Sequence, residues 1–208
     1  MNRFIYIILL SFFCIQCGSD NGDKKVPFKD VDGKYVHLES ENIYLFVPKN
    51  VKMFSNSEYL EFINSIENAQ VREMERARYL YKKYGPENAY IMRSEDLETS
   101  IEFMTMPYFE IDQSVSQEML KLLNKRHKAG GRMLGLESSF SRAGILKFPT
   151  GRVFRAIFLY KGTNLLTGED AQIYSYFYVA NQNNKTFLVS FNSQKAYDFD
   201  SYFQKIRL

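Results

Sequence analysis

The sequence predicts an α+β domain in which helices pack on an antiparallel sheet of about six or more strands. Short segments of alternating apolar and polar residues occur in both halves of the chain. Two longer segments have helical spacing instead, and the last third is rich in strand patterns. The composition suits one globular unit, since 45% of the 208 residues are hydrophobic and 25% are charged.

The first strands are expected shortly after residue 31. They cover residues 34–39 and 42–47. In the second strand apolar side chains alternate with aromatic ones, so both of its faces are expected to be covered. Pro48 ends this strand because proline cannot donate a hydrogen bond to a sheet ladder.

Helical spacing follows over residues 55–84. Apolar side chains recur there every three or four residues, and charged side chains fall mostly on the opposite side. Ser55 and Glu58 have the spacing of a capping box, and Asn68 marks a point where the helix is expected to be interrupted. The Gly-Pro pair that comes next stops the helix.

A second helix is expected over residues 115–127. Its apolar stripe contains Val115, Met119, Leu122 and Leu123. Ser114 is expected to cap its N-terminus, and the two consecutive glycines at positions 130 and 131 are expected to end it.

The remaining segments alternate between apolar and polar residues and are expected to be strands. They are residues 89–93, 100–106, 132–139, 145–148, 152–160, 172–180 and 186–192. Residues 181–184 suit a hairpin connection between the last two strands. A final amphipathic helix over residues 198–207 is expected to bury its aromatic side and Ile206.

The first 16 residues have the layout of a secretion signal. Arg3 is their only charge, and residues 4–15 are mostly apolar. As a helix this run would be about 18 Å long at ~1.5 Å per residue, whereas a bilayer core is about 30 Å thick. The run is therefore interpreted as a signal segment and not as a membrane span.

Both cysteines lie at the end of this segment. Cys17 stands where the apolar run meets a polar segment, which resembles the signal of bacterial lipoproteins. The resemblance implies that Cys17 receives a diacylglyceryl thioether and becomes the first mature residue. Gln16 departs from the pattern, because lipoproteins usually carry Gly, Ala or Ser there, and Cys14 is the rival acceptor. The alternatives are an unlipidated signal peptide and a redox Cys-x-x-Cys pair, which would require a folded βαβ context.

Three parts of the chain are therefore expected. Residues 1–16 form a lipoprotein signal peptide, residues 17–31 a flexible tether, and residues 32–208 a single α+β domain. The lipoprotein resemblance implies that an N-terminal lipid holds the protein at the membrane of the bacterial cell envelope, with the outer membrane favoured over the inner.

Several segments and their order resemble the PsbP-like α/β/α sandwich. They are residues 43–49 (IYLFVPK), 173–178 (IYSYFY) and 186–191, and the terminal helix over residues 199–206. Family members often follow the first Pro-Lys with Gly-Trp, where this chain has Asn50 and Val51. The resemblance extends over residues 35–208. It implies the fold but no function, because a fold does not dictate an activity.

Positive charge gathers where the second helix is expected to end. The residues are Lys125, Arg126, Lys128 and Arg132. Cations at a helix C-terminus interact favourably with the macrodipole, by about 0.3–1 kcal/mol each, and need no ligand there. The alternative interpretation is contact with an anion or with lipid headgroups.

The tyrosines of one predicted strand allow two interpretations. Tyr174, Tyr176 and Tyr178 share one face of the strand, because side chains alternate between faces. Their flat rings with polar tips suit a carbohydrate or a peptide, but rings packed under a helix would show the same pattern. Core packing is the favoured interpretation.

The sequence contains none of the common catalytic or metal-binding motifs considered below. The chain has two histidines, His37 and His127, and lacks the common zinc, nucleophile-elbow and phosphate-loop motifs. The formal net charge of +3 is too small to indicate a nucleic-acid partner. We therefore expect no cofactor, no metal and no nucleic-acid partner.

Three hypotheses about function follow. The leading one is a non-catalytic, lipid-anchored domain that binds an envelope protein or stabilises an assembly. The alternative is an envelope hydrolase or small-ligand binder, which a deep pocket with convergent polar groups would favour. A surface structural or adhesive component is the third, and a large exposed apolar patch would support it.

Overall fold

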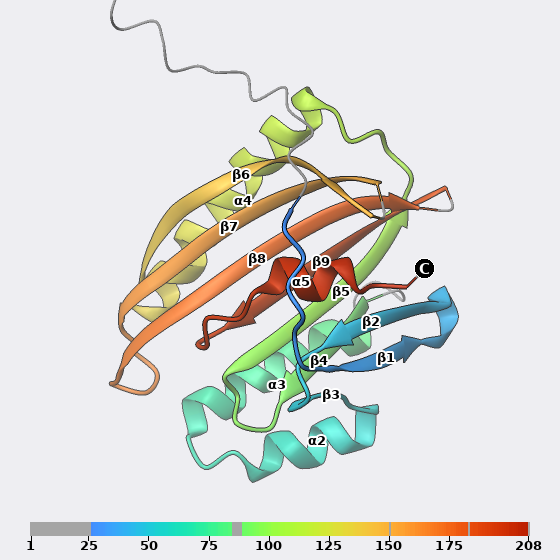
Figure 1. Cartoon of the computed structure of the whole chain (residues 1–208). Coiled ribbons are helices and arrows are strands. Elements are labelled where there is room, and N and C mark those ends of the chain that lie inside the picture. The colour runs from blue at the N-terminus through green and yellow to red at the C-terminus, as the bar shows by residue number, and fades with distance from the viewer. Residues whose placement is uncertain (1–25, 85–88, 150, 183, 208) are drawn as a thin grey trace, which may run out of the picture.

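The computed structural model describes residues 26–84, 89–149, 151–182 and 184–207. These residues form a seven-stranded antiparallel sheet, a separate two-stranded hairpin and helices on both faces of the large sheet (Figure 1). The strand order across the large sheet is β3-β4-β5-β9-β8-β7-β6. The predicted α+β class, with six or more antiparallel strands, is therefore confirmed. Cys17 and the rest of the expected signal peptide lie outside the described residues.

The elements follow one another in a simple order. They are β1 (Lys34–Leu38), the 3-10 turn η1 (Glu39–Glu41), β2 (Ile43–Val47), β3 (Val51–Met53), α2 (Asn56–Ser65), α3 (Ala69–Tyr84), β4 (Ala89–Ser94), β5 (Thr99–Pro107), α4 (Gln113–Leu134), β6 (Glu137–Phe148), β7 (Gly151–Thr163), β8 (Asp170–Gln182), β9 (Lys185–Ser193) and α5 (Phe199–Gln204). Strands β6 to β9 form consecutive hairpins. The pairing of β5 with β9 joins this group to β3, β4 and β5.

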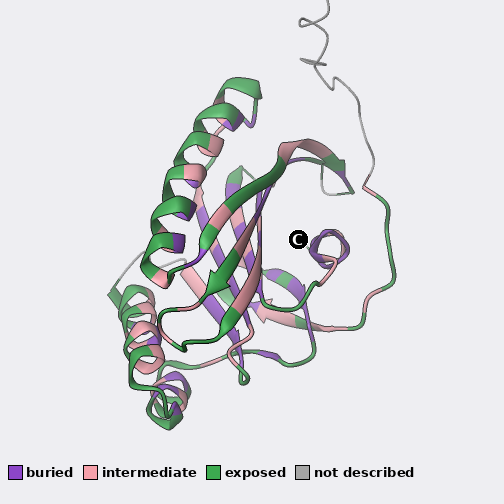
Figure 2. Cartoon of the chain, turned by 90° about the vertical axis from the view of Figure 1, so that its left-hand side faces the viewer, coloured by how far each residue is buried: buried purple, intermediate pink, exposed green. Residues whose placement is uncertain are grey.

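The two faces of the sheet are covered by different elements. Figure 2 shows the sheet edge-on, with α4, α2 and α3 on one side and α5 with the N-terminal segment on the other. We call these sides the α4 face and the α5 face. Because side chains alternate along each strand, every strand contributes to both faces.

Aromatic residues fill the core on the α5 face. Phe199 and Phe203 of α5 are almost completely buried, and so are Phe191 and Tyr178 beneath them. The rings of Tyr178 and Phe203 stack with their centroids 4.4 Å apart. Core packing is thus confirmed for Tyr178, and the predicted burial of the aromatic side of the last helix is confirmed as well.

The first helical segment is divided in two, as the sequence predicts. Helix α2 begins with the expected capping box, in which Glu58 N donates to Ser55 Oγ at 3.3 Å and Ser55 N donates to Glu58 Oε2 at 2.8 Å. The backbone N–H groups of Gln70 and Val71 both donate to Asn68 Oδ1 at 3.0 Å. Asn68 therefore interrupts the segment by capping the start of α3.

Helix α4 differs from the prediction at both ends. Its cap is Asp112, which accepts a hydrogen bond from Val115 N at 2.7 Å, and not Ser114. The helix also continues through the glycine pair and ends at Gly135, whose φ of 73° suits a left-handed C-cap. A Cβ on Gly131 would lie 2.6 Å from Leu136 O, so this glycine permits close packing on β6 instead of ending the helix.

Four further features differ from those expected. Arg132 lies in α4 and not in a strand, and β6 runs without a break where two strands were expected. The short strand β3 was not predicted at all. The last helix ends earlier than expected because the backbone of Arg207 pairs with Tyr44 of β2, with N···O distances of 2.8 and 3.0 Å.

Candidate functional site

A cleft of about 810 Å³ opens on the α4 face between α3 and α4. Helix α4 packs on β6 and β7, and α3 packs near β4, so the middle strands lie between the two helices. Residues of β5, β8 and β9 form the floor of the cleft, and the loops after β4 and β7 contribute to its rim. We call this site the α3–α4 cleft.

Polar side chains form much of the floor. Glu102 and Ser100 of β5 lie directly opposite Ser190 and Asn192 of β9 in the sheet register. Asn192 Oδ1 accepts a hydrogen bond from Ser175 Oγ at 2.7 Å, and Asn192 Nδ2 donates to Ser190 Oγ at 3.2 Å. The floor thus presents hydroxyl, amide and carboxylate groups to the cleft.

A buried charge cluster fixes α3 to the sheet beside this floor. The Glu75 carboxylate is fully buried and accepts hydrogen bonds from Tyr59 Oη at 2.7 Å, Arg93 Nη2 at 2.9 Å and Arg78 Nη1 at 3.3 Å. Burial alone would raise the pKa of Glu75. The two guanidinium groups and the tyrosine hydroxyl outweigh this effect and hold the pKa below its usual value. Glu75 is therefore ionised at neutral pH and holds both arginines in place.

The α4 wall of the cleft contains the buried His127. Its ring stacks on Phe158 with the centroids 3.9 Å apart, and its Nδ1 is hydrogen-bonded to the hydroxyl of Tyr160. Burial, helped by the nearby Arg126, lowers the pKa of His127 to about 4. Burial also raises the pKa of Tyr160 to about 12, so both groups are neutral at pH 7 and supply hydrogen-bonding atoms without charge.

The lining of the cleft carries more acidic than basic residues. The acidic ones are Glu67, Glu95, Asp96, Glu98, Glu102 and Glu169, and the basic ones are Arg78, Arg93 and Arg126. Cations neutralise part of this charge. Lys195 pairs with Asp96 at 3.3 Å and also with Glu98, Lys52 pairs with Glu95, and Arg78 lies 3.8 Å from Glu102. Glu67 and Glu169 have no cation within 4 Å in the described part of the chain. The cleft therefore suits positively charged groups.

The structure separates the four cations that the sequence grouped together. Lys125, Lys128 and Arg132 are exposed and follow each other at spacings of three and four residues, so they share one outer side of α4. Arg126 instead lines the α3–α4 cleft. Only Arg132 lies in the last turn of α4, so the macrodipole interpretation is wrong for the other three.

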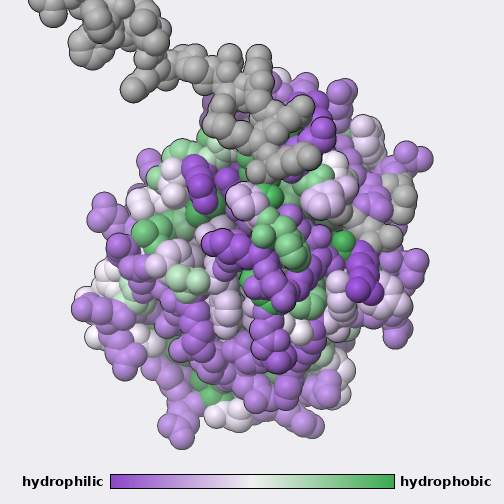
Figure 3. Space-filling view, in the orientation of Figure 1, coloured by the Kyte–Doolittle hydropathy of each residue, from purple (hydrophilic) through white to green (hydrophobic). Residues whose placement is uncertain are grey.

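The described residues contain neither a cluster of potential metal ligands nor a helix suited to cross a membrane. Nowhere in residues 26–84, 89–149, 151–182 and 184–207 do three or more His, Cys, Asp or Glu side chains group as potential metal ligands. None of the helices described here is long and apolar enough to cross a membrane. On the α5 face, seen in Figure 3, hydrophobic side chains occur as small separate areas among hydrophilic ones.

Comparisons with known proteins gave likenesses of fold. No protein-family model and no curated protein matches the chain. The chain is similar to the solution structure of cyanobacterial PsbP from Synechocystis sp. PCC 6803, with a TM-score of 0.49, 8% identity, and coverage of 88% of this chain and 97% of that chain. It is also similar to the Ran-binding protein Mog1p of Saccharomyces cerevisiae, with a TM-score of 0.42, 10% identity, and coverage of 80% and 79%.

Sequence reasoning missed the α3–α4 cleft, although part of its signal was present. Ser190 and Asn192 alternate with large apolar residues in β9, and Ser100 and Glu102 do the same in β5. This alternation indicates two strands with one polar face each. It does not indicate that the two polar faces adjoin, because that depends on the long-range pairing of β5 with β9.

Proposed function

We propose that the chain is a lipid-anchored protein of the bacterial cell envelope whose domain binds a partner without catalysis. The partner is a lysine- or arginine-rich segment of another envelope protein, and it binds in the α3–α4 cleft. The observation that carries this proposal is the excess of acidic over basic residues around an open cleft with a polar floor. Complementary charge steers encounters and selects partners.

The chemistry of the cleft suits recognition of a polypeptide. Ser190 and Asn192 offer donors and acceptors to a main chain or to polar side chains, while Glu67 and Glu169 offer charge at the rim. His127 and Tyr160 are held neutral by burial and face each other, so they add hydrogen-bonding atoms to one wall. Charged side chains of the partner would remain partly hydrated at the rim, where ion pairs mainly affect association rate and specificity.

The expected anchor supports a partner in the envelope. Eight residues lie between Cys17 and Val26, the first described residue, so the two are nine residue steps apart. Fully extended, these nine steps span at most ~30 Å. A lipid on Cys17 would therefore keep the domain close to a membrane surface, where its partners would be other proteins of the envelope.

The anchor is tested by replacing each cysteine in turn. In the native host Cys17→Ala is expected to release the protein from the membrane fraction, and Cys14→Ala is expected to leave it there. The intact mass of the native protein should contain a diacylglyceryl group. Membrane retention of Cys17→Ala, with no lipid in the intact mass, would contradict the anchor.

The binding site is tested by photo-crosslinking in cells. A photoreactive residue replaces Ser190 on the cleft floor or, as a control, the exposed Tyr35 on β1. Position 190 is expected to capture a basic segment that position 35 does not capture. The double variant Glu67→Lys/Glu169→Lys should abolish this product, whereas Glu61→Lys, on exposed α2 surface, should preserve it. Equal products from both positions, or a product insensitive to the charge reversals, would contradict the site.

A small ligand is the second candidate occupant. The volume of about 810 Å³ and the convergent polar groups of the floor lie within the range of small-molecule sites. The charge of the lining then indicates a cationic compound, such as a polyamine. Native mass spectrometry of the protein isolated from its host distinguishes the two, because a small ligand would appear as a fixed added mass without any crosslinked protein.

A further inference from the structure

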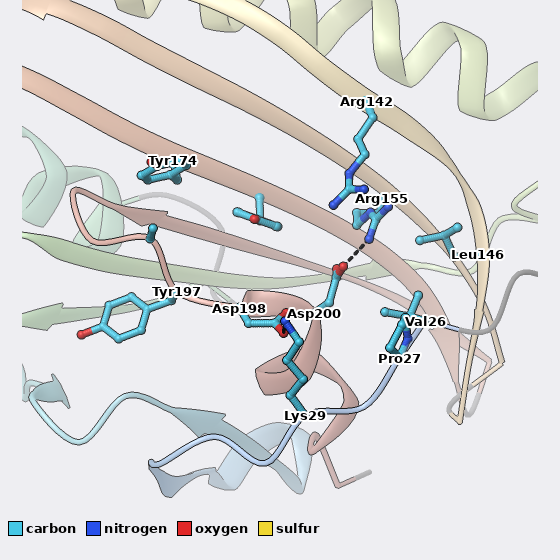
Figure 4. A pocket seen from close by; sticks show the side chains of 12 residues that line it. Val26, Pro27, Lys29, Arg142, Leu146, Arg155, Tyr174, Tyr197, Asp198 and Asp200 are labelled. Carbon is cyan, nitrogen blue, oxygen red and sulfur yellow. Dashed lines mark hydrogen bonds and ion pairs between the residues drawn. The ribbon is translucent and has the colours of Figure 1, made fainter.

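A second cavity, of about 560 Å³, lies on the α5 face (Figure 4). The N-terminal segment contributes Val26, Pro27 and Lys29 to its lining, and the segment at the start of α5 contributes Asp198 and Asp200. Strands β6, β7 and β8 supply its remaining wall, including two arginines and two tyrosines. The sheet thus separates this cavity from the α3–α4 cleft. Its lining has more basic than acidic residues, whereas that of the cleft has more acidic ones.

A β-bulge turns one of the arginines into this cavity. Phe140 pairs with Phe158, whereas Arg142 pairs with Ile157, so the register shifts by one residue around Ser141. Without this shift Arg142 would share a face with Phe140, on the α4 face. The extra residue places Arg142 on the α5 face, where it lines the cavity and points toward Arg155 (Figure 4).

Arg155 is buried in an ion pair, and its Nε lacks a partner among the described residues. Its Nη1 donates to Asp200, which also accepts a hydrogen bond from Tyr178 Oη at 2.7 Å. The side chain is only 10% exposed, and its Nε has no hydrogen-bond partner among the described residues. A buried N–H group without a partner is costly, so an acceptor that reached this Nε would be favoured.

The cavity also has one uncompensated positive charge. Asp200 pairs with Arg155, and Asp198 pairs with Lys29 at 3.5 Å. Arg142 has no carboxylate within 4 Å in the described part of the chain. The lining therefore has an excess of one positive charge, located on the exposed guanidinium group of Arg142.

Open space lies on β6 beside the two arginines. Gly144 is the residue opposite Arg155 on β6, and a Cβ on Gly144 would have no atom within 4 Å. Tyr176 of β8 lines the same cavity. Burial and the Asp200 carboxylate raise the pKa of Tyr176, and the charges of Arg142 and Arg155 partly oppose this rise. Tyr176 therefore remains a hydrogen-bond donor at neutral pH.

We propose that this cavity binds a phosphodiester group between Arg142, the Nε of Arg155 and the hydroxyl of Tyr176. A phosphodiester carries one negative charge, which matches the excess charge of the lining. Its tetrahedral oxygens accept hydrogen bonds from donors on three different strands, and guanidinium groups suit phosphate oxygens in charge and geometry. Tyr174, Tyr197 and Leu146 line the rest of the cavity and would contact the organic part of the ligand.

Two sources share this chemistry, namely a soluble phosphodiester and the headgroup of a phospholipid. The test uses the full chain made by cell-free synthesis without lipid modification. One arm measures binding of glycerophosphoglycerol by calorimetry. The other measures co-sedimentation with vesicles of phosphatidylglycerol, with vesicles of phosphatidylcholine as the neutral reference.

Three variants show whether binding occurs in this cavity. Arg142→Gln removes the excess charge and is expected to weaken binding by about 10-fold or more, as the loss of a charge-assisted hydrogen bond would. Gly144→Leu keeps all charges but fills the space and should abolish binding. Arg152→Gln is the matched control, because Arg152 is an exposed arginine of the same strand as Arg155 on the opposite face. It should bind within about twofold of the unmodified chain.

The pattern of results decides the proposal. Binding of glycerophosphoglycerol with this order of variants supports a soluble ligand, and binding to phosphatidylglycerol vesicles alone with the same order supports a headgroup. No binding in either arm overturns the proposal. An equal loss in Arg142→Gln and Arg152→Gln, or unchanged binding by Gly144→Leu, also overturns it, since attraction to surface charge would then suffice.

Discussion

The same strands form a closed apolar core on one face of the sheet and an open polar cleft on the other. On the α5 face, Phe187, Val189 and Phe191 of β9 pack with α5 in a closed apolar core. On the α4 face, Ser190 and Asn192 of the same strand lie at the floor of an open cleft. A strand whose side chains alternate can thus stabilise the fold on one side and present binding groups on the other.

The helices explain why only one face remains open. The short helix α5 lies on the middle of the sheet and brings its own aromatic rings to it (Figure 1). On the α4 face the helices lie toward the two edges, and the middle strands carry polar side chains that need no cover. We therefore expect large stability effects on the α5 face and mainly binding effects at the floor of the cleft.

The largest effect is expected from Phe203→Ala on the α5 face. The ring is 1% exposed and packs against Tyr178 and Phe148, with centroid distances of 4.4 and 5.1 Å. Its removal should lower the free energy of unfolding by about 3–5 kcal/mol, because a large buried ring leaves a cavity. Urea unfolding measures the change. Leu122→Ala, which truncates an exposed side chain on α4, is the control and should change it little.

The charge cluster beside the cleft is the exception on the α4 face. Glu75→Gln keeps the shape of the side chain but leaves the buried Arg93 without its carboxylate, which should lower stability by about 3 kcal/mol at pH 7. The pKa of Glu75 is lowered in the folded state, so its stabilising contribution is present above the unfolded pKa of 4.5 and lost as pH falls through the folded value. The difference between wild type and Glu75→Gln should therefore shrink in acid. A difference independent of pH would contradict this ionised state.

His127 should make the α4 face sensitive to mild acid. The folded pKa is about 4 and the unfolded one 6.5, so between these values the unfolded chain binds more protons than the folded one. Stability should fall by about 2 kcal/mol between pH 7 and pH 5 from this residue alone. Urea unfolding at both pH values should show this loss reduced in His127→Gln and retained in His37→Gln on β1. Two variants with the same pH dependence would contradict the burial of a neutral imidazole.

Local signals in the sequence predicted much of the fold. The capping box of Ser55 and Glu58, the break at Asn68 and the apolar side of the last helix each depend on residues a few positions apart. Such features follow from propensity and spacing, and the structure confirms them.

Features that depend on distant contacts were not predictable in this way. The glycine pair in α4 suggests a helix end, but Gly131 lies against Leu136 and permits the helix to continue. The bulge at Ser141 changes the face on which Arg142 lies, and no local pattern indicates it. The α3–α4 cleft requires the pairing of β5 with β9, whose residues lie more than 75 positions apart. These contacts are decided by tertiary packing, which the spacing of residues does not encode.

The smallest effect on stability is expected from the cations on the outer side of α4. It shows whether these charges stabilise the helix or leave a surface free for contact with an anion. Arg132 lies in the last turn, so Arg132→Gln should lower stability by about 0.3–1 kcal/mol at low salt and by less at high salt. Lys125 and Lys128 lie further from the helix end, are exposed and have no ion pair among the described residues. Their Gln variants should therefore leave stability unchanged within about 0.5 kcal/mol at either salt concentration. Equal, salt-dependent losses at all three positions would instead mean that the charges act together. The basic side of α4 would then be a structural feature, as the aromatic α5 face is, and not a surface free for contact with an anion.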